Sequence, residues 1–524
     1  MASSTTTTKK LSDLLKHVDT HELVLPEIQR DFVWTKKSVL LLFDSLFRGL
    51  PIGHMLVWKA KKPVPVKGKG KLDFHSFYGY LLDGQQRLTA LQRVRDADDS
   101  FRLMFYTWPR RDDEGNDFFA WQSNWTISNE WYVDVAQVLR GEFVVLKYLD
   151  TIKKNEYFEK GMENKIHEEL MQLSDILKRD IGVIEFETDD YRQATELFIR
   201  FNSTGRKLGK SDLLVAELAV NVPGLTSDEV HILAHKWPGF SFTVPFLVQC
   251  LLAVNSGRLE TKRAQVTWGR TTPAEIRKSW SLTARGLSHV IAFLTGTVRW
   301  KSSDLIPSFN ALIPLVVVAA NRDGFTERER ALARRWLLLA SVRGLFSGST
   351  YTELNRILKH LQKEESVQEL WKATSTKLKK LRSEDFEVSR ISGPITSLFL
   401  SMLADNDARD WKSKDFKLDG QVHGHGARLQ VHHFFPRSLL RKHDIGQDRI
   451  NTFANYTVIS SATNLDVGVE EPGTYMKRLD VPVEQLEIQC IPRDRDLWRV
   501  GRYEEFLEER EKLLAAAANK FLGM

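Results

Sequence analysis

The sequence predicts an α+β multidomain protein, with an α+β N-terminal domain, a mostly helical middle region and a C-terminal domain built from a β-hairpin and a helix. A chain of 524 residues is too long for one compact core. Short strand-like runs mixed with helical spacing fill about the first 220 residues, whereas long amphipathic stretches dominate the middle. We therefore expect domains over residues 1–222, 223–404 and 405–524.

The N-terminal domain begins with a pattern of strand, turn and helix. Each predicted element is bounded by glycine, proline or a polar turn. In chain order we expect a helix through Leu40–Phe47, a strand at Ile52–Trp58, an exposed loop at Lys59–Lys71, a strand at Phe77–Leu82 and a helix through Leu88–Val94. Phe32, Leu197 and Phe198 are assigned to the core, and Trp34 is interpreted as a core anchor.

The rest of this domain and the middle region are expected to be largely helical. A strand at Val183–Phe186 precedes two helices, Tyr191–Phe201 and Leu213–Val220, separated by the helix-ending segment Asn202–Gly205. Amphipathic spacing predicts further helices at Glu327–Leu345 and Tyr351–Leu361, with Arg334 and Arg335 on a solvated face. The polar stretch Asp405–Gly426, with His423 and His425, is interpreted as a solvated approach to the third domain.

Composition narrows the class of protein. With 42% hydrophobic and 27% charged residues, the chain can bury a substantial core. Its formal charge of +7 favours a polyanionic partner only slightly. Two cysteines, Cys250 and Cys490, exclude a disulfide framework and a four-cysteine zinc site. A bound metal would therefore depend mainly on His, Asn, Asp or Glu.

No segment of the sequence predicts export or membrane insertion. The first ten residues are a Ser/Thr run followed by two lysines and lack the apolar stretch of a signal peptide. The most apolar run, Ala311–Ala320, is about half of the roughly 20 residues that cross a bilayer and contains Pro314, so we expect a buried helix. We expect a soluble, cytoplasmic protein without a membrane partner.

The pentapeptide Asp83-Gly84-Gln85-Gln86-Arg87 lies where a predicted strand meets a predicted helix. Backbone N–H groups at a helix start can receive an anion, and Gly84 permits a sharp turn and close approach. Arg87 could fork onto a phosphate, Gln85 and Gln86 could donate hydrogen bonds, and Asp83 could orient a metal ion or water. The alternative is a plain helix N-cap at Asp83, and the pentapeptide alone does not separate the two interpretations.

A second group of polar residues lies near the C-terminus. A predicted strand from Arg428 ends on His432 and His433, shortly before Pro436, and a returning strand is expected at Tyr456–Ile459. Histidine can accept a proton near neutral pH, and one divalent ion held by few protein ligands can stabilise charge on a phosphodiester. The alternative is that these histidines are ordinary edge-strand residues and that Asn455 and Asn464 are turn formers.

In residue type and spacing this C-terminal segment resembles the HNH, or ββα-metal, nucleases. Asn455 lies just before the second strand, and Asn464 follows it by nine positions. The resemblance implies that His432 and Asn464 bind a metal ion, Mg²⁺ or Mn²⁺, that His433 is the general base, and that Asn455 holds the base in position. The sequence departs from the family pattern in one respect: a Lys commonly follows the last Asn by a few positions, and here Leu465-Asp466-Val467-Gly468 offers none.

The N-terminal motifs resemble those of the GmrSD-type restriction family, which joins a ParB-like domain to an HNH domain. The resemblance rests on residues 26–34, 49–53, 83–87 and 201–205, followed by Leu208 and Asp212. It implies binding or hydrolysis of a nucleotide triphosphate, ATP or GTP. The residues implied in nucleotide binding are Asp83, Gly84, Gln85, Gln86 and Arg87, with Gln29, Arg30 and Asn202 in support.

Together these resemblances imply a nucleotide-regulated, divalent-metal-dependent DNA endonuclease of a prokaryotic anti-phage defence system. Its expected substrate is double-stranded DNA, in particular modified phage DNA, and the oligomeric state is left open. The alternative is a regulatory protein that binds DNA or nucleotide through a decayed HNH domain without cutting.

Overall fold

The computed structural model describes residues 3–29, 31–66, 77–108, 118–204, 210–259, 268, 271–348, 350–388, 393–418 and 429–524. The chain divides into two compact units, Met1–Glu229 and Val230–Met524. The three-domain division expected from the sequence stays a prediction, but its first boundary lies close to the division between these units.

The first unit is built on a mixed sheet with strand order β1-β8-β3-β4-β2. β1 and β4 run antiparallel to their neighbours β8 and β3, whereas β3 pairs with β8, and β2 with β4, in parallel. The strands of this sheet are β1 (Ser3–Lys10), β2 (Leu23–Val24), β3 (Met55–Lys59), β4 (Gly79–Asp83) and β8 (Asp180–Glu187).

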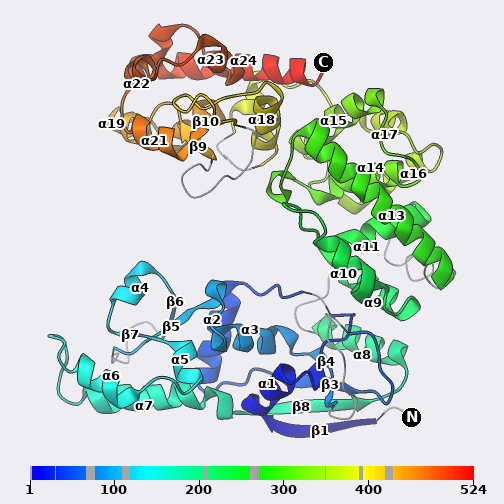
Figure 1. Ribbon diagram of the computed structural model, residues 1–524, viewed down its shortest axis with the longest axis vertical. Coiled ribbons are helices and arrows are strands. Elements are labelled where there is room, and N and C mark those ends of the chain that lie inside the picture. The colour runs from blue at the N-terminus through cyan, green and yellow to red at the C-terminus, as the bar shows by residue number, and fades with distance from the viewer. Residues whose placement is uncertain are drawn as a thin grey trace. The chain divides into compact units, whose positions relative to one another are not determined.

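Helices surround this sheet and a smaller antiparallel one of order β6-β5-β7 (Figure 1). The smaller sheet consists of β5 (Leu103–Tyr106), β6 (Phe119–Trp121) and β7 (Tyr132–Asp134). The helices of the unit are α1 (Leu11–Asp19), α2 (Lys36–Phe47), α3 (Gln85–Arg95), α4 (Asn124–Ser128), α5 (Val135–Leu139), α6 (Val145–Ile152), α7 (Met162–Ser174), α8 (Tyr191–Thr204) and α9 (Lys210–Asn221).

Alternating side chains of β3 and β4 enter two different cores. Met55, Val57 and Leu81 join the cluster that includes residues of α1, α2 and α3. Leu56, Trp58, Tyr80 and Leu82 join a second cluster with residues of α8 and α9. Because both faces of these strands are covered, their sequences are continuously apolar, which is why they were predictable as short apolar runs. Phe198 is buried as expected, whereas Phe32 and Leu197 are only partly buried.

The second unit begins with the helical region predicted from amphipathic spacing. α14 is buried along its whole length, which confirms the expected buried helix. The helices of this region are α10 (His231–Ala234), α11 (Val244–Ser256), α13 (Pro273–Phe293), α14 (Leu312–Ala320), α15 (Glu327–Val342), α16 (Thr350–Leu361), α17 (Val367–Thr374) and α18 (Pro394–Asp405). Within the described ranges, no helix combines the length and the apolarity that crossing a membrane requires.

The prediction that Arg334 and Arg335 lie on a solvated helix face is wrong. Arg334 donates to the carbonyl of Phe521, and Arg335 donates to those of Leu522 and Gly523, so both arginines bind the C-terminal end of the last helix. Carbonyl groups at a helix C-terminus lack partners within the helix and attract cations. A contact so distant along the chain leaves no signal in the local charge pattern.

The C-terminal part of this unit holds a two-stranded sheet among short helices and one long helix. Its elements are β9 (Leu429–His433), α19 (Arg437–Lys442), α20 (Gln447–Ile450), β10 (Tyr456–Ser460), α21 (Ser461–Val467), α22 (Pro472–Leu479), α23 (Val483–Ile488) and α24 (Tyr503–Phe521). Phe434, which follows β9, stacks on Phe506 of α24 with ring centroids 4.8 Å apart. Aromatic contacts of this kind, between residues far apart in the sequence, attach the hairpin to the unit's core.

Part of the segment 405–418 belongs to this core rather than to a solvated approach: Ala408, Asp410, Trp411 and Leu418 are buried, whereas most of its other residues are exposed. Trp411 is completely buried and packs in the cluster formed by Phe434, Tyr475 and Phe506. The sequence interpretation was wrong here because one tryptophan among polar residues gives no periodic signal. His423 and His425 lie outside the described residues.

Candidate metal-dependent nuclease centre

The two predicted strands are present as β9 and β10, with α19 and α20 between them in the chain and α21 directly after β10. β9 and β10 pair antiparallel, with His433 opposite Tyr456 and His432 opposite Thr457. The outer edge of β10 is occupied by Gln489, whose side chain accepts a hydrogen bond from the Val458 N–H at 2.9 Å and donates to the Val458 carbonyl at 2.8 Å. This side chain satisfies backbone groups that a third strand would otherwise pair, and so stabilises a sheet of only two strands.

His432 and Asn464 are brought together, although they are 32 positions apart in the sequence. The side chain of Asn464, on α21, lies within hydrogen-bonding reach of the His432 ring. Burial and, to a smaller extent, the neighbouring His433 lower the pKa of His432 to about 4, whereas Asn464 opposes the shift. The ring is therefore neutral at physiological pH, which is the state in which imidazole binds metals.

His433 ends β9 and is held by Asn451. The ring nitrogen Nε2 lies 3.1 Å from Asn451 Oδ1, which also accepts a hydrogen bond from the Tyr456 hydroxyl at 3.2 Å. Since an amide oxygen can only accept, Nε2 carries the proton and Nδ1 keeps its lone pair. Burial is the main cause that lowers the pKa of His433 to about 4; Asn451 opposes this shift, and the charge of Arg437 contributes to it.

Asn455 is fully buried and clamps the chain that follows His433. Its Oδ1 accepts from the Phe435 N–H at 2.9 Å, and its Nδ2 donates to the carbonyls of Phe435 and Ile450. Its own carbonyl accepts from the Phe434 N–H at 2.6 Å. Asn455 therefore positions the end of β9 and does not itself face a substrate.

Asp410 was missed by the sequence interpretation. This carboxylate is 1% exposed, and it accepts hydrogen bonds from the Ser460 N–H at 2.7 Å, from the Ser413 N–H at 3.0 Å and from the Thr463 hydroxyl. Ser460 is the N-cap of α21 and accepts from the Thr463 N–H. Asp410 thus anchors the start of the helix that carries Asn464. One Asp among several in a polar stretch offered no signal of this.

The residues around His432 fit a divalent cation. Nε2 of His432 is buried and has no hydrogen-bond partner in the part of the chain that the structure describes. A buried imidazole nitrogen without a hydrogen-bond partner destabilises the fold unless it binds a ligand such as a metal ion. The adjacent Asn464 side chain supplies an oxygen ligand. Among the described residues no group of three or more His, Cys, Asp or Glu could hold a metal ion. A site made by His432 and Asn464 would leave most coordination positions to water and substrate.

The Asp83–Arg87 pentapeptide lies at the junction of β4 and α3, as expected. Gly84 has φ +102°, and a Cβ at this position would lie 2.0 Å from the sulfur of Met55, so only glycine fits. Arg87 donates to the carbonyl of Ile52 at 2.7 Å, to that of His54 at 2.8 Å and to Asp83 Oδ2 at 2.7 Å. In this structure the guanidinium therefore binds the chain rather than facing outward.

The glutamines of these motifs are likewise bonded within the fold. Gln29 donates to the carbonyls of Leu81 and Leu82, while Gln86 accepts from the Val33 N–H and donates to the Asp31 carbonyl. Gln85 is buried. Asn202 lies near the end of α8, and Arg30 lies outside the described residues. The motif residues thus join two loops to the β4–α3 turn.

Glu27, in the same motif region, is buried with its carboxyl group against a distant turn. It accepts from the N–H groups of Gly224 and Ser227, at 3.0 and 3.3 Å. Burial raises its pKa to about 7, although the two hydrogen bonds act to lower it. The folded chain therefore prefers the neutral carboxyl group at a pH where the unfolded chain is already ionised.

We expect this carboxyl group to make stability depend on pH. Because its pKa is raised on folding, its contribution is complete below about pH 4.5 and is lost as the pH rises to about 7. The loss is at most roughly 3 kcal/mol. Chemical denaturation of the wild type and of Glu27→Gln across this pH range measures the loss. As the pH rises, the free energy of unfolding of the wild type should fall relative to that of Glu27→Gln. A difference that does not change with pH would contradict the assignment.

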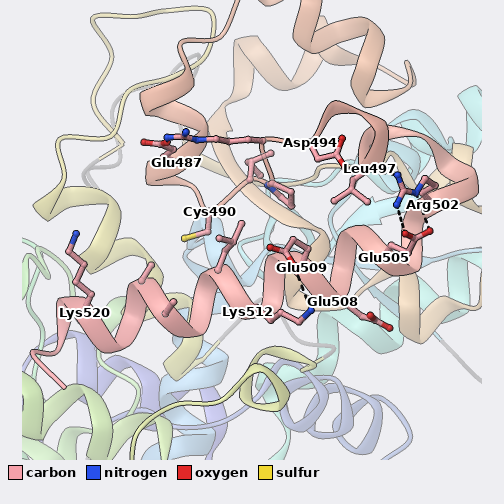
Figure 2. A pocket seen from close by; sticks show the side chains of 16 residues that line it. Glu487, Cys490, Asp494, Leu497, Arg502, Glu505, Glu508, Glu509, Lys512 and Lys520 are labelled. Carbon is pink, nitrogen blue, oxygen red and sulfur yellow. Dashed lines mark hydrogen bonds and ion pairs between the residues drawn. The ribbon is translucent and has the colours of Figure 1, made fainter.

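A groove on the second unit is lined by residues other than those predicted. It has a volume of about 920 Å³ and lies along α24, with residues 487–497 on its other side (Figure 2). Figure 2 shows Arg502 paired with Glu505, and Lys512 with Glu509. Its five acidic and four basic side chains are mixed and largely paired, so the groove carries only a small net charge.

Comparisons with known proteins support the family resemblance in the first unit. Residues 11–219 match the family model described as the N-terminal domain of GmrSD restriction endonucleases. This match supports the GmrSD family and a restriction-type nuclease. An uncharacterized protein of Methanocaldococcus jannaschii is 23% identical, with 92% of this chain and 87% of that protein aligned. That similarity extends beyond the region matched by the family model into the second unit.

Proposed function

We propose that this protein is a restriction-type endonuclease that hydrolyses DNA at the ββα centre of its second unit. One observation carries the proposal: the hairpin and α21 bring the side chain of Asn464 to His432, whose buried Nε2 has no partner among the described residues, beside a neutral His433. The GmrSD match over residues 11–219 supports a nuclease of a defence system.

His433 is proposed to act as the general base. Its Nδ1 lone pair would accept the proton of a water molecule as that water attacks the phosphorus, while Asn451 holds the protonated Nε2. Asn455 keeps the chain after His433 in place through its bonds to Phe435 and Ile450. His432 and Asn464 would hold a Mg²⁺ or Mn²⁺ ion, which when bound stabilises negative charge on the phosphate oxygens.

The first unit is proposed to bind a nucleotide triphosphate, ATP or GTP, and to control cutting. The β4–α3 turn supports this, because Gly84 lets the backbone approach closely and the N-terminus of α3 favours an anion. Arg87 would contribute by shaping the turn. We further propose that the preferred substrate is modified phage DNA, in line with the GmrSD match.

A cleavage assay with the purified chain tests this proposal. Plasmid DNA and DNA from phages with modified bases are incubated with Mg²⁺ or Mn²⁺, with and without ATP or GTP, and in parallel with EDTA. We expect cutting that requires the metal and responds to nucleotide. If the wild type binds these DNAs but leaves all of them intact under every condition, the protein is a binding regulator and the nuclease proposal is wrong.

A further inference from the structure

α19 exposes a basic face immediately after the strand that ends in His433. Leu440 is completely buried in the core and anchors the helix, whereas Arg437, Arg441 and Lys442 are exposed. Residues four apart lie on the same side of a helix, so Arg437 and Arg441 are neighbours separated by roughly 6 Å along its axis. We call Arg437, Arg441 and Lys442 the basic face.

The two arginines of the basic face differ from most other arginines in this part of the chain. Among the arginines of residues 429–524, five pair with carboxylates: Arg449, Arg478, Arg493, Arg499 and Arg502. Arg495 lies over the ring of Trp498, and buried Arg510 donates to backbone carbonyls.

The basic face, by contrast, has no carboxylate within 4 Å in the described part of the chain. Its one hydrogen bond with a described residue is that from Arg441 to the neutral Gln447. Three exposed cations without counter-charges are suited to an anionic partner.

The basic face also lies next to the proposed cleavage centre. Arg437 follows His433 by four positions, across Pro436. α19 begins at Arg437, directly after Pro436, and His433 is opposite Tyr456 in the hairpin. The helix that carries the basic face therefore starts next to the end of the hairpin where water would attack.

We propose that the basic face binds the phosphate backbone of duplex DNA beside the cleavage centre. Arg437 and Arg441 would each fork onto a phosphate, and Lys442 would act as a further point charge. This inference rests on the proposed nuclease function, because that function supplies the DNA. It also accounts for the absence of a Lys after Asn464, since basic contacts to the substrate would come from α19 instead of α21.

Salt-dependent binding of a short fluorescent DNA duplex to the full chain, measured by anisotropy in EDTA, tests the basic face without cutting. We expect the slope of log affinity against log salt to decrease by roughly 2 in the double variant Arg437→Ala/Arg441→Ala, about one per lost phosphate contact. The matched control, Arg499→Ala/Arg502→Ala, removes the same charge from carboxylate-paired positions and should keep the wild-type slope.

The outcomes separate this inference from the nuclease proposal. A double variant with the wild-type slope, or a control with the same decrease, would overturn the basic face even if the wild type cuts DNA. A preference of the basic face for an RNA duplex over DNA would overturn it as well. Conversely, a wild type that binds with the expected slope but never cuts with Mg²⁺ or Mn²⁺ removes the nuclease proposal and leaves the DNA-binding face in place.

Discussion

His433→Ala should reduce the rate of DNA cleavage by roughly 10²- to 10⁴-fold, the contribution that a general base usually makes. The variant removes the Nδ1 lone pair that would accept the proton from water. His432 and Asn464 remain, so affinity for Mn²⁺ should change little. Single-turnover cleavage with saturating protein measures the chemical step, and titration with Mn²⁺ measures the metal site in the same preparation.

Two comparisons make this result specific. His443→Ala removes an exposed histidine just after α19, ten positions away, and should cut at the wild-type rate. His432→Ala should instead weaken Mn²⁺ binding, because it removes a proposed ligand. If His433→Ala cuts as fast as the wild type, another group is the base and the role assigned to this residue is wrong.

The sequence predicted those parts of the site that depend on spacing along the chain. A strand ending in His432-His433 and a returning strand at Tyr456–Ile459 are local patterns, and the structure has both at nearly the expected bounds. Asn464 was expected on a helix or a loop, and it lies on α21. In the first unit, β3, β4 and α3 were predictable for the same reason. Buried strands and amphipathic helices leave their period in the sequence.

Other parts of the fold could not be predicted, because their partners are distant in the chain. β1 is a run of Ser, Thr and Lys that forms an edge strand only by pairing with β8, more than 170 positions later. Its polar residues show no alternation and were left without an assigned structure. Gln489, which satisfies the edge of β10, is similarly invisible to any local pattern.

The nucleotide motif shows a different limit of sequence reasoning. Residue types suited to phosphate binding, Gln29, Gln86 and Arg87, were interpreted as ligand-binding groups. In the structure their side chains are bonded to backbone groups of neighbouring loops. A Gln or Arg offers the same donors to a carbonyl as to a phosphate, so residue type alone does not separate these roles. Nucleotide binding at this turn stays a prediction.

Substitution of Asp410 should have the second large effect, because this residue anchors the start of α21. Asp410→Ala removes one buried carboxylate and leaves the Ser460 N–H, the Ser413 N–H and the Thr463 hydroxyl without their acceptor. Losing hydrogen bonds to a buried charged group should lower the free energy of unfolding by about 3 kcal/mol. Thermal and chemical denaturation of the full chain measure this loss.

Stability alone would not distinguish anchoring of α21 from ordinary packing, so metal affinity is the deciding measurement. Asn464 is the fourth residue of α21. If the start of this helix is no longer anchored, the Asn464 side chain can move away from His432. Loss of such a supporting contact usually weakens metal binding by roughly 10- to 100-fold. We expect that decrease in Mn²⁺ titrations of Asp410→Ala at a temperature where the variant remains folded.

Asp410→Asn and Asp415→Ala complete the test. The Asn variant keeps one oxygen for the Ser460 N–H but cannot accept from the Ser413 N–H through its amide nitrogen, so its Mn²⁺ affinity should lie between those of wild type and Asp410→Ala. Asp415 is exposed on the same segment, and its removal should leave Mn²⁺ affinity unchanged. An Asp410→Ala protein that is destabilised yet binds Mn²⁺ like the wild type would show that α21 holds Asn464 in place without this carboxylate.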